Sequence, residues 1–178
     1  MKGCGKTAVG KITAGKLKIP FIDTDKLLEK KYSEKTGLGL SCREIFRKHG
    51  SKYFGRLEHL CLVDLTAGGT DNCVIACGGG TAIKKESLKL LKVLGKIFYL
   101  KQKGDVLYSR VIKNGIPAFV SASGDPEKIF LSILKRRERI YQKNSDAVIE
   151  CAGKSARQIA DLLLSHNYHT TVRGSYAK

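Results

Sequence analysis

Short apolar runs alternate with longer amphipathic segments along this chain, and the alternation limits the folds that it can adopt. The apolar runs are IPFIDTD, NCVIACGGG, GKIFYL and DAVIEC, at residues 19–25, 72–80, 95–100 and 146–151. Runs of this length and character predict buried strands, whereas the segments between them have helical periodicity. Strands and helices in alternation predict an α/β fold, in which helices cover both faces of a parallel sheet.

Several predicted helices begin with recognisable capping residues. Ser41 and Glu44 have the spacing of a capping box. Asp125 precedes Pro126, which suits the first position of a helix, and Ser155 precedes the last amphipathic segment. In the segment YFGRLEHLCLVDL, the apolar residues expected near one helical face are Tyr53, Phe54, Leu57, Leu60, Cys61 and Leu65.

Size and charge restrict the class of protein. The 178 residues suit one domain, and no run approaches the ~18–20 apolar residues of a membrane span. The 33 basic and 16 acidic residues give a net charge of +17, which suits anionic ligands such as nucleotides but equally a solvated basic surface. The lysines are scattered, which argues against a dedicated nucleic-acid surface. The six cysteines form no C-x-x-C pair, so we interpret them as reduced cytoplasmic thiols.

The segment GCGKT at residues 3–7 matches the end of the phosphate-loop motif G-x-x-x-x-G-K-[ST]. Backbone N–H groups of such a loop, and of the helix that follows it, bind phosphate oxygens. Lys6 would reach the β- and γ-phosphates of a nucleotide, and Thr7 would hold Mg²⁺ through its hydroxyl. A glycine-rich turn before a helix is the alternative interpretation.

Two acidic residues follow the first predicted strand, at the edge of the sheet where α/β proteins bind ligands. Asp23 would hold Mg²⁺ through water, and Asp25 would face an alcohol substrate. The alternative is a turn at the strand end in which Asp25 caps the next helix.

Glycines and arginines complete the set of candidate site residues. The glycines at 78–80 follow the strand VIAC directly and would let a ligand approach the backbone, although a flexible turn also fits. Arg136, Arg137 and Arg139 lie on one predicted helix, and arginine binds carboxylates through two parallel hydrogen bonds. Arg136 and Arg139 also fit a solvated helix face.

The ordered set of GxGKT, PFIDTD, EIF…F…E, a strand ending in GGG, and RR…Y resembles the shikimate kinase family, from Gly3 to about Leu164. The resemblance implies transfer of the ATP γ-phosphate to the 3-hydroxyl of shikimate, in cytoplasmic biosynthesis of aromatic amino acids through chorismate. It implies a P-loop NTPase-type parallel sheet in the order 2-3-1-4-5. We expect one kinase domain over residues 1–167, a lid at about 108–124, and a flexible tail over 168–178. We expect a monomer with ATP and shikimate as ligands, and neither nucleic acid nor a membrane as partner.

The resemblance also assigns roles to individual residues. Lys6 and Asp25 would be catalytic, and Mg²⁺ would be held at Thr7 and Asp23. The ATP-binding residues would be Gly3, Cys4, Gly5, Lys6, Thr7, Ala8, Arg110 and Lys154. The shikimate-binding residues would be Asp25, Gly78, Gly79, Gly80 and Arg137, of which Gly79 contacts the ligand through its backbone and Arg137 binds the carboxylate.

Two positions depart from the family pattern. Where the family has F-R-x-x-E, with a second arginine for the carboxylate, this chain has FGRLE, with Gly55 in that place and Arg56 one residue later. One helical residue turns a side chain by about 100°, away from the expected direction. The lid dipeptide Arg-Pro is replaced by Ile116-Pro117, with Arg110 and Lys113 nearby. These losses leave open a P-loop kinase for another small alcohol, or a non-catalytic nucleotide-binding relative.

The position of the phosphate loop leads to one more expectation. The first glycine of the motif would stand six positions before Lys6, ahead of Met1, and the strand that leads into such a loop would lie further upstream. We therefore expect that an apolar strand and this glycine belong before Met1. In the implied sheet that strand is central, so without it two neighbouring strands would have unpaired edges.

Overall fold

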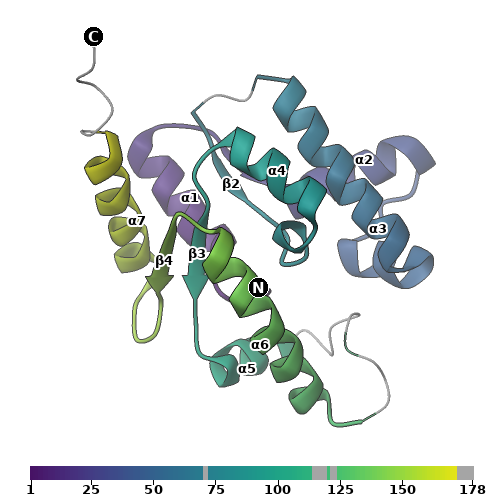
Figure 1. The fold of residues 1–178 in the computed structure, drawn as a ribbon. Helices are drawn as coiled ribbons and strands as arrows, with labels where there is room; N and C mark the ends of the chain where they lie inside the picture. The colour runs from purple at the N-terminus through teal and green to yellow at the C-terminus, as the bar shows by residue number, and fades with distance from the viewer. Residues whose placement is uncertain (70–71, 114–119, 121–123, 172–178) are drawn as a thin grey trace.

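The computed structural model describes residues 1–69, 72–113, 120 and 124–171, and the side chains of these residues up to 166. Its elements are α1 (Lys6–Leu17), β1 (Phe21–Asp23), α2 (Thr24–Thr36), α3 (Cys42–Ala67), β2 (Val74–Ala76), the 3-10 helix η1 (Thr81–Ile83), α4 (Lys85–Leu94), β3 (Phe98–Lys101), α5 (Gly104–Ile112), α6 (Pro126–Asn144), β4 (Ala147–Glu150) and α7 (Ala156–Thr171). The expected alternation of strands and helices is therefore confirmed (Figure 1).

All four predicted strands form, and they pair in parallel as two separate sheets of two strands each. In the first sheet, β1 pairs with β2, and Asp23 stands opposite Ala76. In the second, β3 pairs with β4, and Lys101 stands opposite Glu150. Instead of one continuous sheet, the described residues thus form two pairs, and β2 and β3 are each hydrogen-bonded to a strand on one side only.

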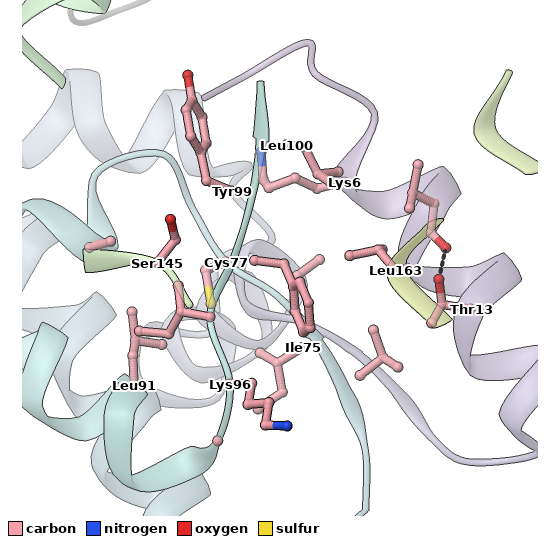
Figure 2. A pocket seen from close by; sticks show the side chains of 18 of the residues that line it. Lys6, Thr13, Ile75, Cys77, Leu91, Lys96, Tyr99, Leu100, Ser145 and Leu163 are labelled. Atoms are coloured by element: carbon pink, nitrogen blue, oxygen red, sulfur yellow. Dashed lines mark hydrogen bonds between the residues drawn. The ribbon is translucent and has the colours of Figure 1, made fainter. Parts of the chain in front are cut away.

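A cavity of about 530 Å³ separates the two strand pairs. Its walls include Ile75 and Cys77 on the β2 side and Tyr99 and Leu100 of β3, and Met1 also lines it. Figure 2 shows this cavity from close by, with Leu91 of α4 on one side and Thr13 of α1 and Leu163 of α7 on the other. The cavity therefore lies between the strand pairs, and Cys4, Lys6, Gly78 and Gly79 of the site described below are among the residues that line it.

Helix α1 connects the two halves, because it contacts β1 and β2 as well as α7 (Figure 1). A Cβ atom at Gly10 of α1 would lie 2.5 Å from Cε2 of Phe21, so only glycine allows the helix to approach β1 this closely. On the far side of β2, α3 packs against α2 and α4. The apolar core is divided accordingly: one cluster surrounds β3 and β4, and two smaller clusters join α2, α3 and α4.

The predicted helix starts are confirmed. Ser41 and Glu44 form the capping box at the start of α3, and the Asp125 carboxylate accepts hydrogen bonds from two N–H groups of α6. The hydroxyl of Ser155 accepts a hydrogen bond from the N–H of Gln158 at the start of α7. The idea that Asp25 caps α2 is wrong, because Asp23 is the capping residue and accepts from the N–H of Asp25.

Three further details refine the sequence expectations. The helix predicted to begin at Ser41 and the helical segment predicted over residues 53–65 form one long helix, α3. This helix is interrupted at Gly50, whose φ of 75° lies in the left-handed region. Leu60, expected near the apolar face of this helix, is 47% exposed. Helix α7 continues to Thr171, into the segment expected to be a tail, and residues 172–178 lie outside the described part. In the described ranges, no helix combines the length and the apolar character that crossing a bilayer requires.

Candidate active site

The phosphate loop is built from glycines in conformations that other residues avoid. Gly3 and Gly5 have φ values of 84° and 91°, and Gly5 is the residue that precedes α1. A Cβ atom at Gly3 would also lie 3.0 Å from Cγ2 of Val111. The first turn of α1, from Lys6 through the exposed Ala8, has neither an acidic residue nor a side-chain cap. Its N–H groups are therefore available to an anion.

Lys6 and Thr7 tie this loop to its surroundings. The Lys6 ammonium donates to the carbonyl oxygen of Met1 at 2.8 Å, and thus folds back over the loop. The Thr7 hydroxyl donates to Oδ2 of Asp23 at 2.8 Å. The other oxygen of this carboxylate accepts from the N–H of Asp25 at 3.0 Å. A single aspartate thus joins the phosphate loop, the end of β1 and the start of α2.

Cys4 is buried inside the loop, and its thiol donates to the carbonyl oxygen of Met1 at 3.1 Å. Burial alone would raise the pKa of this thiol, but the neighbouring charge of Lys6 and the amine of Met1 outweigh it, and the pKa is lowered. The six cysteines all lie in the described residues and form no disulfide, and Cys61 and Cys151 are buried like Cys4.

Asp25 lies just past the carboxyl end of β1, beside residues 78–80, which we call the glycine segment. A Cβ atom at Gly78 would lie 3.1 Å from Oδ1 of Asp25 and 2.8 Å from Oε1 of Glu58, so glycine is what lets both carboxylates approach this point. Although Asp25 as a residue is exposed, the surrounding protein desolvates its carboxylate, which raises its pKa against the opposing charge of Lys6.

The backbone of the glycine segment is held in place from three sides. The Thr24 hydroxyl donates to the carbonyl oxygen of Ala76 at 3.2 Å and accepts from the N–H of Gly78 at 3.1 Å. The Tyr141 hydroxyl donates to the carbonyl oxygen of Gly79. A Cβ atom at Gly79 would lie 3.3 Å from Cα of Met1, so the phosphate loop and this segment are adjacent. The following Gly80 precedes η1.

Arg137 is the half-buried member of the arginine group on α6, whereas Arg136 and Arg139 are exposed. Its guanidinium contacts Sδ of Met1 at 3.7 Å. Its charge also acts on Glu58, whose pKa burial raises while Lys84 and Arg137 act in the opposite direction. Arg137 therefore points to the same side of the molecule as Glu58 and the phosphate loop.

Arg110 and Lys154 are the two expected ATP-binding residues that lie outside the phosphate loop and α1. The Arg110 guanidinium on α5 donates to the carbonyl oxygen of Gly3 at 3.2 Å, so it borders the phosphate loop. Lys154 is exposed in the turn after β4. Both charges act against the burial that raises the pKa of Cys151 to about 11. The replaced lid dipeptide Ile116-Pro117 lies outside the described residues.

Sequence reasoning missed the roles of two residues in this cluster. Oε1 of Glu58 accepts from the Thr81 hydroxyl at 3.1 Å, and its other oxygen lies 3.8 Å from the ammonium of Lys84. Glu58 belongs to the segment FGRLE, so the pattern that pointed to Gly55 could also have pointed to it. Nothing in the sequence pattern singles out Lys84. Arg56 is exposed, as the rotation of one residue along the helix suggests.

This arrangement brings a phosphate loop, a hydroxyl–carboxylate pair, two carboxylates and several cations to one end of the strands. The sequence model of the family described as Shikimate kinase matches residues 2–167. The chain belongs to the shikimate kinase family.

Individual relatives agree with the family match. A shikimate kinase from Caldanaerobacter subterraneus subsp. tengcongensis is 36% identical over 159 residues, which cover 89% of this chain and 87% of that protein. One from Pelotomaculum thermopropionicum is 35% identical over 169 residues, 93% of each chain.

Solved structures of the family share the fold of this member. Shikimate kinase from Acinetobacter baumannii in complex with shikimate has a TM-score of 0.79 at 27% identity, over 94% of this chain and 89% of that one. The enzyme from Aquifex aeolicus has a TM-score of 0.76 at 27% identity, over 97% and 95%. The mixed α/β fold with parallel strands is thus the fold of the shikimate kinases.

Proposed function

We propose that this chain is an ATP-dependent phosphotransferase that moves the γ-phosphate of ATP to the 3-hydroxyl of shikimate, in the cytoplasmic synthesis of aromatic amino acids. The observation that carries the proposal is the juxtaposition of the phosphate loop with Asp25 and the glycine segment. The match to the family over residues 2–167 supports it. Phosphoryl transfer depends mainly on positioning and on stabilisation of charge, and this cluster offers both.

The phosphate loop and Lys6 act on the phosphates of ATP. The free N–H groups at the start of α1 bind phosphate oxygens, and the Lys6 ammonium neutralises charge on the phosphoryl group as it moves. Thr7 and Asp23 present a hydroxyl and a carboxylate 2.8 Å apart, the oxygen ligands that Mg²⁺ prefers, so the pair fits this ion. When bound there, Mg²⁺ would neutralise phosphate charge.

Asp25 and Arg137 act on the acceptor, shikimate. The carboxylate of Asp25 orients the acceptor hydroxyl and accepts its proton while the hydroxyl oxygen bonds to the γ-phosphorus. The bond from that phosphorus to the β–γ bridging oxygen breaks, and ADP leaves. Arg137 binds the shikimate carboxylate at the far end and so fixes the hydroxyl in line with the phosphate.

A coupled assay of ADP release tests the proposal. With MgATP present, release should depend on shikimate and should not respond to small alcohols that lack a carboxylate. The Asp25→Asn variant is the control, because it keeps the shape of the side chain and removes its basicity. Shikimate-independent release, or a better alcohol without a carboxylate, would contradict the assignment.

We also propose that the cavity between β2 and β3 is the position of the central strand of the family sheet. In the expected order 2-3-1-4-5, strands 2 and 3 correspond to β1 and β2, and strands 4 and 5 correspond to β3 and β4. These are the two pairs that form, and each is parallel. Met1, which lies directly before the phosphate loop, is among the residues that line the cavity.

A further inference from the structure

The space beside Gly55 is filled by the end of a lysine side chain. Gly55 is buried on α3, and a Cβ atom there would lie 1.5 Å from Nζ of Lys84 and 2.8 Å from its Cε. Lys84 is the residue that precedes α4, directly after η1 and the glycine segment. Because Gly55 has no side chain, the lysine can extend across the face of α3 and place its ammonium at a point that any other residue would occupy.

The ammonium of Lys84 lies beside Glu58, on the acceptor side of the site. Oε2 of Glu58 lies 3.8 Å from Nζ of Lys84, and Glu58 is 10% exposed by its side chain. The other oxygen of Glu58 and Oδ1 of Asp25 both lie within 3.1 Å of the same point, the Cβ position that Gly78 lacks. Lys84 is therefore one side chain away from the carboxylate that faces the acceptor hydroxyl.

The contact between Lys84 and Glu58 leaves the ammonium able to bind a ligand. At 3.8 Å this contact is an ion pair and is too long for a hydrogen bond. It is the ion pair found for Lys84 among the described residues. An ammonium has three donors, and 41% of this side chain is exposed. Glu58 thus holds the Lys84 ammonium in position, and the N–H donors of the ammonium stay available to a ligand.

Arg137 approaches the same cluster from α6. Its guanidinium contacts Sδ of Met1 at 3.7 Å, and Cα of Met1 lies 3.3 Å from the Cβ position that Gly79 lacks. The neighbouring Gly78 is the point that Asp25 and Glu58 both approach, so Arg137 and Lys84 come from different elements to the same group of residues, and both charges act on Glu58. Two cations at one site fit an anionic group of the ligand, and a carboxylate can accept from both at once.

We propose that Lys84 is a specificity-determining residue, whose ammonium binds the carboxylate of the acceptor together with Arg137, in the space that Gly55 leaves open. The inference rests on the proposed function. It explains how the chain keeps two cations for this carboxylate although α3 has glycine where the resemblance leads one to expect arginine. Lysine binds as a point charge and not as a fork, so the contact tolerates more variation in ligand geometry.

The test is a set of variants measured with shikimate and with its methyl ester, in which the carboxylate carries no charge. Lys84→Met keeps the length of the side chain and removes the ammonium. Because a hydrogen bond to a charged group is involved, KM for shikimate should rise about 10-fold or more, with KM for ATP unchanged. With the methyl ester, wild type and Lys84→Met should have the same KM. Lys85→Met, at the exposed next residue, is the matched control and should behave as wild type.

Gly55→Arg provides a second, independent readout. In wild type the arginine must displace Lys84 from the shared space, so the gain in affinity for shikimate should be small. In the Lys84→Met background the same change should recover most of the lost affinity. Equal effects of Gly55→Arg in both backgrounds would show that the two cations do not share a site.

Two results would overturn the inference while leaving the proposed function intact. One is wild-type turnover of shikimate with an unchanged KM in Lys84→Met. The other is an equal loss with shikimate and with the methyl ester, which would mean that Lys84 acts only on Glu58. If wild type does not phosphorylate shikimate at all, the proposed function itself fails.

Discussion

Replacing Gly10 by alanine tests how closely α1 must approach β1. The added Cβ atom would lie 2.5 Å from Cε2 and 3.2 Å from Cδ2 of Phe21, so the ring or the helix has to move. Overpacking of this kind costs about 1–3 kcal/mol of the free energy of unfolding. Alanine also favours the helix over glycine by about 0.5–1 kcal/mol, which offsets part of that cost.

Gly15→Ala in the same helix separates the two effects. Nothing lies within 4 Å of a Cβ atom at Gly15, so this variant should gain the helix term alone. The difference between the two variants therefore isolates the overpacking, about 1–3 kcal/mol. At roughly 2–4 °C per kcal/mol for a chain of this size, Gly10→Ala should melt about 2–12 °C below Gly15→Ala.

The same displacement should reach the active site. If α1 moves away from β1, the distance of 2.8 Å between the Thr7 hydroxyl and the Asp23 carboxylate increases, and turnover should fall in Gly10→Ala but not in Gly15→Ala. Thermal and urea denaturation give the stabilities, and the coupled ADP assay gives turnover. The reasoning is refuted if Gly10→Ala is at least as stable as Gly15→Ala.

Three other predictions concern the site and the cavity. Lys6→Ala and Asp25→Asn should each abolish turnover without lowering the melting temperature. Desolvation raises the pKa of Asp25 despite the opposing charge of Lys6. Wild-type kcat should therefore fall as the pH drops through a value above the usual aspartate range, because this carboxylate gains a proton there. Near-normal kcat in Asp25→Asn would rule out its role. Alkylation of Cys4 should be slow because the thiol is buried, should block ATP binding, and should be prevented by MgATP; equal labelling with and without MgATP would argue against an intact loop. An apolar strand of about six residues followed by glycine, fused before Met1, should raise the melting temperature and tighten ATP binding, whereas a Gly/Ser segment of equal length should do neither. Identical behaviour of the two fusions would exclude a strand position in the cavity.

Local sequence signals predicted the elements and the ends of the strands well, because their causes are local. The capping box at Ser41 and the Asp125–Pro126 start of α6 depend on residues close together in the chain, and both formed. The apolar runs predicted each strand and, through the family resemblance, each pairing. Leu60 was misplaced because it lies at the border of the apolar face of α3, where periodicity does not decide exposure.

Contacts between distant segments could not be predicted in this way. The position of Lys84 beside Gly55 depends on how α3 and the start of α4 meet, and no repeat or spacing in the sequence records it. The hydrogen bond from Arg110 to Gly3 joins two residues that lie 107 positions apart in the chain. The interruption of α3 at Gly50 is a similar case, since glycine permits the left-handed conformation but does not by itself demand it.

The division of the strands into two pairs has a consequence for amide hydrogen exchange. The described core consists of one cluster around β3 and β4 and smaller clusters around α2, α3 and α4, and α1 joins the two sides. Regions with separate cores open separately, so the amides of β1 and β2 should exchange at a different free energy of opening from those of β3 and β4. The Tyr141 hydroxyl, which donates to the carbonyl oxygen of Gly79, links the two regions. Tyr141→Phe should therefore accelerate exchange in one strand pair more than in the other, and would show which half of the molecule opens first.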